Sequence, residues 1–404
     1  KNTKSFLTGE MYDPLLAFRP HFNALARVGY FKLVFSPEKK WKSKLHYYYR
    51  VFIWIGVITY NLQHIIRAIQ VRHHTDHLVG TLFILLTTIN TFGKQLSFNV
   101  RVQRIDKILE TITNPLLAPQ NCHHEDLMKV NAKSMLKLLT FYHRSIYFCA
   151  ILFIFTPLIE NALGNNVYLT GYFPFDYSTS PAFEIAALFE GILISLQGYG
   201  HVTMDCTIVS FYAYVKTQLQ IFRYNLEHFL DEFRVRTDLK YVDEDENLKE
   251  LLHQKFVNCV KHYDKIVWFA REIELMFNEA MIIQFFMMAW VICMTVYKIV
   301  GLALFTAEFF SMAMYLCCML AQLFIYCYFG TLLKDESELV NESIYQSEWL
   351  SLSPVFRRRL LIVMERCKRA IEPRTAFIIP MSIDTYISVL RSSYALFTII
   401  DNRK

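Results

Sequence analysis

Apolar residues along the chain gather into seven blocks, which are separated by stretches rich in polar and charged residues. A helix needs about 20 predominantly apolar residues to cross the hydrocarbon core of a bilayer. The blocks are comparable to that length or longer, and they run over Leu45–Ile66, His77–Phe98, Ser145–Leu163, Phe183–Val215, Phe277–Val300, Phe309–Leu333 and Ala376–Ile400. The pattern therefore predicts an all-α membrane protein with seven transmembrane helices.

Composition agrees with this prediction. Of the 404 residues, 54% are hydrophobic and 19% are charged, whereas soluble domains contain about a quarter charged residues. The first forty residues are mixed and basic, so no secretory signal peptide is expected. The amphipathic stretch "LLAFRPHFNALARVGYF" predicts a helix that lies on the membrane surface or packs on the cytosolic ends of the other helices.

Lysine and arginine gather on one side of the predicted spans, and this side is normally the cytoplasm. They are frequent before the first span, in the loop from Lys94 and Arg101 to Arg144, from Lys216 to Arg271, and from Arg357 to Arg374. The loop 164–182 contains none. The amino terminus is therefore expected in the cytosol and, after seven crossings, the carboxyl terminus outside the cell.

Two segments on the cytosolic side have the spacing of amphipathic helices. In the first, apolar residues recur every three or four positions from Leu248 to Val267, directly before the fifth span. In the second, "SPVFRRRLLIVMERCKRAIEP", Ser353 and Pro354 favour a helix start and Pro373 a stop. The last hydrophobic element is thus split into a cytosolic helix and a membrane helix.

These features divide the chain into six parts. We expect a cytosolic segment at 1–44, spans one to four at 45–215, a cytosolic helical anchor at 216–276, spans five and six at 277–333, a cytosolic anchor helix at 334–374 and the last span at 375–404. The apolar faces of the anchor helices suit contacts between subunits, through Leu248, Leu252, Phe256, Leu360 and Val363. The alternative is that these faces cover only the chain's own helices.

Motifs for other chemistries are weak. "GYG" at 198–200 lies inside a continuous apolar span, where small residues serve close helix packing better than an ion filter. His73, His74 and His77 lack a fourth metal ligand, and a solvated loop explains them better. No nucleophile–base motif, phosphate-binding loop or dinucleotide turn occurs. We therefore expect neither an enzyme nor a cofactor.

Ionisable residues inside membrane spans are functional candidates because burying a charge in lipid is unfavourable. Glu160, Glu184 and Glu190 lie toward the outer ends of the third and fourth spans, and Asp205 lies deeper in the fourth. Each is either a functional group or a packing group with a satisfied partner.

The last third of the chain resembles the carboxyl-terminal region of insect odorant receptors. The resemblance rests on "FGTLLKDES" at the end of the sixth span, "IYQSEW", "RRRLLIVMERC" and the closing "SYALFT", in that order. It implies a ligand-gated, non-selective cation channel of four subunits, in which a variable odorant-binding subunit joins a shared coreceptor in the plasma membrane of a sensory neuron dendrite. The chain resembles a variable subunit because it lacks the long cytosolic insertion of coreceptors after the fourth span.

For such a receptor we expect an apolar volatile ligand to bind among spans two, three, four and six, in their outer halves. Depth and helical spacing select the candidate ligand-binding residues Phe83, Thr87, Leu152, Phe155, Thr156, Ile159, Phe189, Ile192, Leu193, Leu196, Phe309, Met312 and Tyr315. Aromatic residues at helical spacing also serve ordinary packing, so we expect about a third of these residues to touch ligand.

The resemblance also places the last span around a central pore. Ile399 matches the position of the apolar gate ring, Leu396 lies one turn below it, and Asn402 matches an amide position just outside. Asp401 either attracts cations at the outer mouth or faces neighbouring loops. The alternative is that Ile399 faces lipid and Leu396 packs on the fifth span. The chain is expected to end at this outer mouth.

Two other functions fit a seven-helix protein. A gustatory receptor-like channel would share the topology and bind tastants, but the T-Y-x5-Q-F ending of that family is absent. A metabotropic seven-helix receptor would have the opposite orientation to that predicted from the basic residues.

Overall fold

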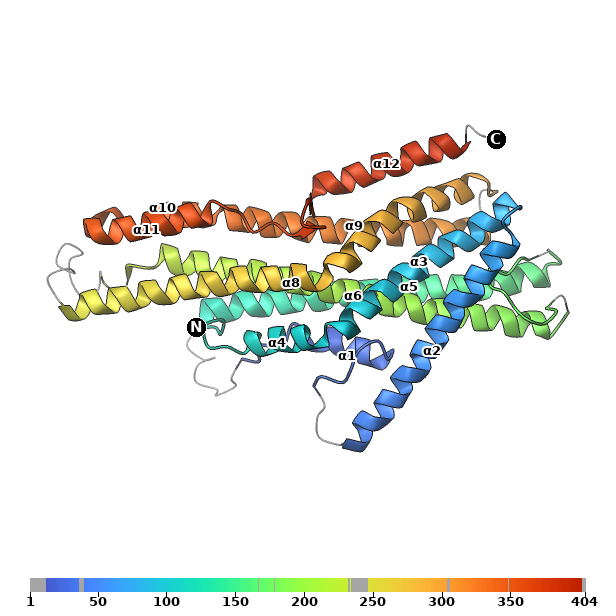
Figure 1. The fold of residues 1–404 in the computed structure, drawn as a ribbon, viewed down its shortest axis with the longest axis horizontal. Coiled ribbons are helices and arrows are strands. Elements are labelled where there is room, and N and C mark those ends of the chain that lie inside the picture. The colour runs from blue at the N-terminus through green and yellow to red at the C-terminus, as the bar shows by residue number, and fades with distance from the viewer. Residues whose placement is uncertain are drawn as a thin grey trace.

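The computed structural model describes residues 12–35, 40–165, 167–177, 179–231, 233, 246–303, 306–347 and 349–401. Its long helices run roughly along one axis and form an elongated bundle (Figure 1). In chain order the first helices are α1 (Arg19–Arg27), α2 (Lys40–Gln70), α3 (Thr75–Val100), α4 (Val102–Ile112), α5 (Cys122–Ala162) and α6 (Ala182–Glu227). They are followed by α8 (Glu246–Val300), α9 (Ala307–Glu338), α10 (Val340–Gln346), the short 3-10 helix η2 (Trp349–Ser351) and α11 (Pro354–Cys367). Strands β1 (Arg374–Thr375) and β2 (Ile379–Pro380) and helix α12 (Ile383–Asp401) complete the fold.

Seven of these helices correspond to the predicted spans. Within the described ranges, α2, α5, α6, α8 and α9 are long and apolar enough to cross a membrane by length and composition alone. The other two predicted spans are α3 and α12. Helix α3 carries the polar residues Asn90, Lys94 and Gln95 within its apolar block, and all three are buried. The chain is thus an all-α, seven-helix membrane protein with a single two-stranded hairpin among its described residues.

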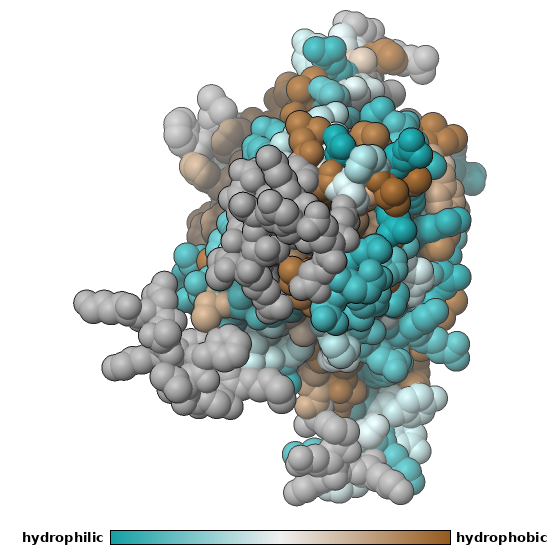
Figure 2. All heavy atoms as spheres, turned by 90° about the vertical axis from the view of Figure 1, so that its left-hand side faces the viewer, coloured by the Kyte–Doolittle hydropathy of each residue, from teal (hydrophilic) through white to brown (hydrophobic). Residues whose placement is uncertain are grey.

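Helices α5, α6 and α8, with 41, 46 and 55 residues, are longer than a bilayer crossing requires. Helix α8 is continuous over 55 residues, so the amphipathic segment 248–267 runs without a break into the fifth span. Figure 2 looks onto the end of the molecule that holds α10, α11 and the start of α8, and much of this end is hydrophilic. Such a surface suits contact with water rather than with lipid.

The amphipathic amino-terminal stretch packs on the bundle. Phe18, which precedes α1, and Phe22 within it are fully buried, and their rings lie 4.9 and 6.3 Å from the ring of Phe211 on α6. Tyr30 follows α1 and lies against Gly200 of α6, where any Cβ would collide with the tyrosine ring. Gly200, the second glycine of "GYG", therefore permits a close approach between the amino-terminal stretch and α6.

The last hydrophobic element is split, as its prolines predict. Helix α11 ends at Cys367, and the β1–β2 hairpin turns the chain through Ala376 and Phe377, both with positive φ, before α12 begins. The backbone amide of Ile383 donates to the hydroxyl of Thr331 on α9 at 3.1 Å. This bond fixes the start of α12 beside α9, and Figure 1 shows α12 running along the edge of the bundle.

Candidate functional site: two connected chambers

Helices α3, α5, α6 and α9 enclose an inner chamber of about 70 Å³. A second, outer chamber of about 440 Å³ lies toward the predicted extracellular ends of the same helices. Both are lined by Ile84, Phe153 and Ile194, so they adjoin one another. The surrounding spans are the second, third, fourth and sixth, which are the ones expected to hold the ligand.

Three aromatic rings meet where the chambers adjoin. The ring of Tyr315 on α9 lies 5.5 Å from that of Phe83 on α3 and 6.1 Å from that of Phe153 on α5, both at steep angles. The hydroxyls of Tyr315 and Thr87 are hydrogen-bonded to each other. Edge-to-face rings of this kind hold one another in place, so Tyr315 has a defined position between the chambers.

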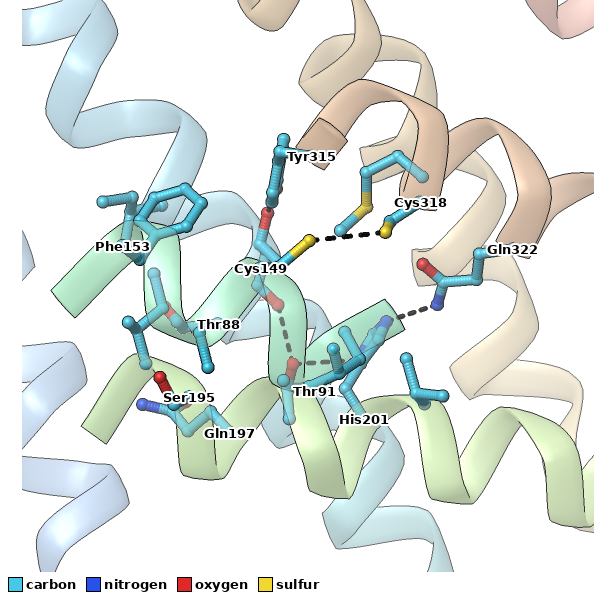
Figure 3. Close-up of a pocket in the computed structure, with 18 residues that line it drawn as sticks. Thr88, Thr91, Cys149, Phe153, Ser195, Gln197, His201, Tyr315, Cys318 and Gln322 are labelled. Atoms are coloured by element: carbon cyan, nitrogen blue, oxygen red, sulfur yellow. Dashed lines mark hydrogen bonds between the residues drawn. The ribbon is translucent and has the colours of Figure 1, made fainter. Parts of the chain in front are cut away.

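Threonines of α3 form one wall of the inner chamber (Figure 3). The hydroxyls of Thr87 and Thr91 donate to the carbonyl oxygens of Phe83 and Thr87, one turn earlier, and the hydroxyl of Thr88 donates to the carbonyl of Leu85. A hydroxyl bonded to its own helix is satisfied without a partner from the chamber. These side chains therefore give the wall a largely apolar character.

A buried polar network lies at one end of the inner chamber. His201 on α6 contacts Thr91 at 2.8 Å through Nδ1, and its Nε2 lies 2.5 Å from Nε2 of Gln322 and 3.3 Å from Nζ of Lys94. Because Lys94 and Gln322 are donors, Nε2 accepts and the imidazole proton is assigned to Nδ1.

Asp205 accepts hydrogen bonds from three side chains of this network. Lys94 and Gln322 donate to its two carboxylate oxygens, and the hydroxyl of Tyr326 donates to Oδ1 at 2.5 Å. The network joins α3, α6 and α9. A buried charge is tolerated when it is paired and hydrogen-bonded in this way.

The pattern of basic residues predicts Lys94 in a cytosolic loop, and this prediction is wrong. Lys94 lies within α3 with no exposed surface, because Asp205 supplies the opposite charge. The other intramembrane acids are less enclosed. Glu160 and Glu190 line the outer chamber, and Glu184 in the first turn of α6 has a buried Oε2 without a hydrogen-bond partner.

The outer chamber is more polar than the inner one. The hydroxyl of Thr170 donates to Glu190, and Nε2 of His64 lies 3.5 Å from the same carboxylate. His77 stacks on Tyr168 with ring centroids 3.9 Å apart, and Lys298 pairs with Glu308 at 3.0 Å. In the described part of the chain, no three His, Cys, Asp or Glu side chains are arranged to hold a metal ion.

The candidate ligand-binding residues fall into two groups. Thr87 and Tyr315 line the inner chamber, and Phe83, Thr156 and Met312 line the outer one. The remaining candidates line neither chamber: Phe155, Ile159, Phe189 and Ile192 are exposed on the outside of the bundle, and Leu152, Leu193, Leu196 and Phe309 are half-buried. Sequence reasoning placed them at a suitable depth, but helical spacing alone did not identify the face that turns inward.

Several lining residues were not among the candidates. They include Gln197 and His201 on α6 and Gln322 on α9. Each is a polar residue inside an apolar block, and this is the signal that identifies them, because polar side chains within a membrane span normally face other helices or a cavity.

The predicted subunit contacts lie mostly inside the chain. Leu252 and Leu360 are buried in one apolar cluster, against which Leu248 and Phe256 also pack, and Val363 packs on the main core. The ring of Phe356 on α11 lies 5.1 Å from that of Phe256 on α8. The apolar residues that α11 leaves exposed are Val355, Leu361 and Ile362.

Of the expected pore residues, Ile399 is exposed on α12. Leu396 and Asp401 belong to α12, but their side chains lie outside the described part of the structure, as does the whole of Asn402. Tyr394, which lies earlier on α12, is also exposed.

The comparisons with known proteins agree with this architecture. Residues 75–394 match the family model of the seven-transmembrane odorant receptors. Odorant receptor 46a, isoform A, of Drosophila melanogaster is 22% identical over 368 residues, which cover 90% of this chain and 92% of that protein. Odorant receptor Or1 of Anopheles gambiae is 19% identical and covers 81% of each chain.

The fold is also similar to a solved structure, that of the olfactory receptor OR5 from Machilis hrabei in complex with eugenol. The TM-score is 0.82, with 13% identity over 97% of this chain and 100% of that one. Since the family match spans most of the sequence and the seven-helix fold accompanies it, this chain belongs to the insect odorant receptor family.

Proposed function

We propose that the chain is a variable, odorant-binding subunit of a ligand-gated, non-selective cation channel. Its ligand is a small, volatile, mostly apolar molecule that binds in the inner chamber. The observation that carries this proposal is the chamber itself, which lies among four membrane helices and has a largely apolar wall with a few polar groups. Ligand sites of small molecules have this composition.

Helix α9 connects the chamber to the last helix. Tyr315, Cys318 and Gln322 of α9 line the chamber. Two residues after Gln322, Phe324 packs on Tyr386 of α12, with ring centroids 5.7 Å apart. We propose that a ligand held against α9 shifts α12, which lines a central pore at Leu396, Ile399, Asp401 and Asn402. A ring of branched apolar side chains at Ile399 blocks ions by excluding water.

The channel we propose is a tetramer with the odorant receptor coreceptor in the plasma membrane of a sensory neuron dendrite, surrounded by membrane lipids. The segments 216–276 and 334–374 anchor the subunits in the cytosol. The exposed apolar residues of α11 and the length of α8 beyond its span support this arrangement.

The test is to record currents from cells that express the chain with the coreceptor, the coreceptor alone, or the chain alone, against a panel of volatile compounds. The proposal expects a compound that opens a cation current only when both proteins are present. If no compound distinguishes the pair from the coreceptor alone, although the chain reaches the cell surface, the proposed function is wrong.

A further inference from the structure

Gln197 lies on α6, one turn before His201, and its side chain lines the inner chamber. It is 2% exposed, and neither its Nε2 nor its Oε1 has a hydrogen-bond partner. Buried amide groups normally have hydrogen-bond partners, because it is unfavourable to remove an amide from water unless a new hydrogen bond replaces those it made there. Gln197 therefore presents an unused donor and an unused acceptor to the chamber.

The other polar side chains that line the inner chamber already have partners. Ser195 donates to the carbonyl of Gly191 at 2.6 Å, and the sulfur atoms of Cys149 and Cys318 contact each other at 3.6 Å. The threonines, Tyr315, His201 and Gln322 make the hydrogen bonds described above. Among the residues that line this chamber, only Gln197 has its whole polar group unpaired.

Figure 3 shows that Gln197 lies apart from the His201–Gln322 network. It shares one end of the pocket with Ser195 and Thr88, whereas Cys318 and Gln322 lie at the other. The charged pair Lys94 and Asp205 does not line the chamber. A ligand there meets the unpaired amide of Gln197 at one end, and at the other end His201 and Gln322, whose polar groups already have partners.

We infer that Gln197 is a specificity-determining residue, and that the inner chamber takes a compact apolar molecule carrying a single hydroxyl group. This inference rests on the proposed function. A hydroxyl donates to Oε1 while its oxygen accepts from Nε2, so it satisfies both atoms of the amide. A carbonyl accepts from Nε2 only, and a hydrocarbon satisfies neither. The expected order of affinity is alcohol, then ketone or aldehyde, then hydrocarbon of the same shape.

The experiment measures binding directly, on the purified full chain in its assembly with the coreceptor, by ligand-dependent thermal stabilisation. The probes are pairs in which a methyl group replaces the hydroxyl: benzyl alcohol with ethylbenzene, cyclohexanol with methylcyclohexane, and 1-hexanol with heptane. In the parent protein, each alcohol that binds should do so at least about tenfold more tightly than the hydrocarbon of its pair. The hydrocarbon leaves both amide atoms of a site built for a hydroxyl without a hydrogen bond. Gln197→Met should abolish that difference by weakening only the alcohol.

Gln95→Met is the matched control. Gln95 on α3 is also buried with both amide atoms unpartnered, but it lines neither chamber, so its replacement should keep the preference for alcohols. Equal affinity within every pair in the parent protein, or binding of no alcohol at all, would overturn the inference. These outcomes do not depend on whether Gln197→Met folds. Alcohols that bind through Gln197 without opening a current would support the inference while contradicting the proposed channel function.

Discussion

The ammonium group of Lys94 on α3 donates to the carboxylate of Asp205 on α6, and the two side chains are 0% and 1% exposed. Removing one partner of a buried ion pair leaves the other charge uncompensated, which typically destabilises a protein by roughly 3–5 kcal/mol. We therefore expect Lys94→Met, and separately Asp205→Asn, to lower the yield and melting temperature of the purified protein sharply.

The double variant tests the electrostatic cause. Lys94→Met combined with Asp205→Asn removes both charges and keeps a polar side chain beside Tyr326 and Gln322. Most of the lost stability should return, because no unpaired charge remains. Strictly additive losses in the double variant would show that the two side chains contribute through packing alone.

Ligand potency should depend on Tyr315 and not on Phe155. The ring of Tyr315 lies between the two chambers, whereas Phe155 is 51% exposed on the outside of α5. Losing the ring of a residue in contact with ligand removes apolar contact worth about 1–3 kcal/mol. Tyr315→Ala should raise the half-maximal odorant concentration about tenfold or more, at surface expression measured in parallel. Phe155→Ala should leave it close to the parent value.

This pair of residues departs from the expectation formed on the sequence, which treated Phe155 and Tyr315 alike. An equal shift for both variants would mean that the ligand binds outside the two chambers, at a surface that includes Phe155.

The two faces of α11 should have separate roles. Leu360 is 5% exposed within the apolar cluster that α11 forms with α8, and Ile362 is 71% exposed. Leu360→Ala should destabilise the subunit by about 2–5 kcal/mol, since it opens a cavity. Ile362→Asp should leave the melting temperature of the isolated chain unchanged and abolish co-purification with the coreceptor. Retained co-purification would remove this face of α11 from the subunit contact.

Much of the fold follows from the apolar pattern because lipid requires each spanning segment to satisfy its backbone hydrogen bonds internally. Ser353 and Pro354 likewise predicted the first residue of α11, whereas the helix ends at Cys367, six residues before Pro373. The count of basic residues that predicts the cytosolic side included Lys94, which is buried in α3, since such a count cannot detect a partner 111 positions away in the sequence.

The chambers were harder to predict than the helices. Phe153 lines both chambers while Phe155, two positions later, faces outward. Both are aromatic and lie at the same depth, so only the rotation of α5 against α6 and α9 decides between them. That rotation depends on packing between distant segments, which the spacing of residues within one helix does not specify.

The end of the bundle that is predicted to lie in the cytosol should lose stability in acid. His262 on α8 is bonded to Oε1 of Gln218 at 3.0 Å, and burial, with a smaller contribution from the charge of His124, lowers its pKa from 6.5 to about 4. The folded protein therefore keeps His262 neutral in an interval where the unfolded chain binds a proton. Stability is present above pH 6.5 and is lost as the pH falls toward about 4.

Thermal unfolding of the purified protein between about pH 7 and about pH 4.5 measures this effect. Over this interval the melting temperature of the parent protein should fall further than that of His262→Gln. In that variant the titrating group is absent and an amide can still bond to Gln218. Equal losses in the two proteins would assign the acid response to other groups, with His124, whose pKa burial also lowers to about 4, as the first of them.

The exposed position of Ile399 bears on the gate. In the isolated chain its side chain is 54% exposed near the end of α12, and α12 is held to the bundle further back, where the hydroxyl of Ser393 donates to the carbonyl of Ala289 at 3.2 Å. In a tetramer around a central pore, Ile399 would meet its counterparts and exclude water from the closed channel. Ile399→Ser should then raise the current without odorant or alter the preference among cations.

Ile400→Ser provides the matched control, because the next residue lies about 100° around the helix and should leave both properties unchanged. Parent-like currents from Ile399→Ser at normal surface expression would show that this face of α12 does not line the pore.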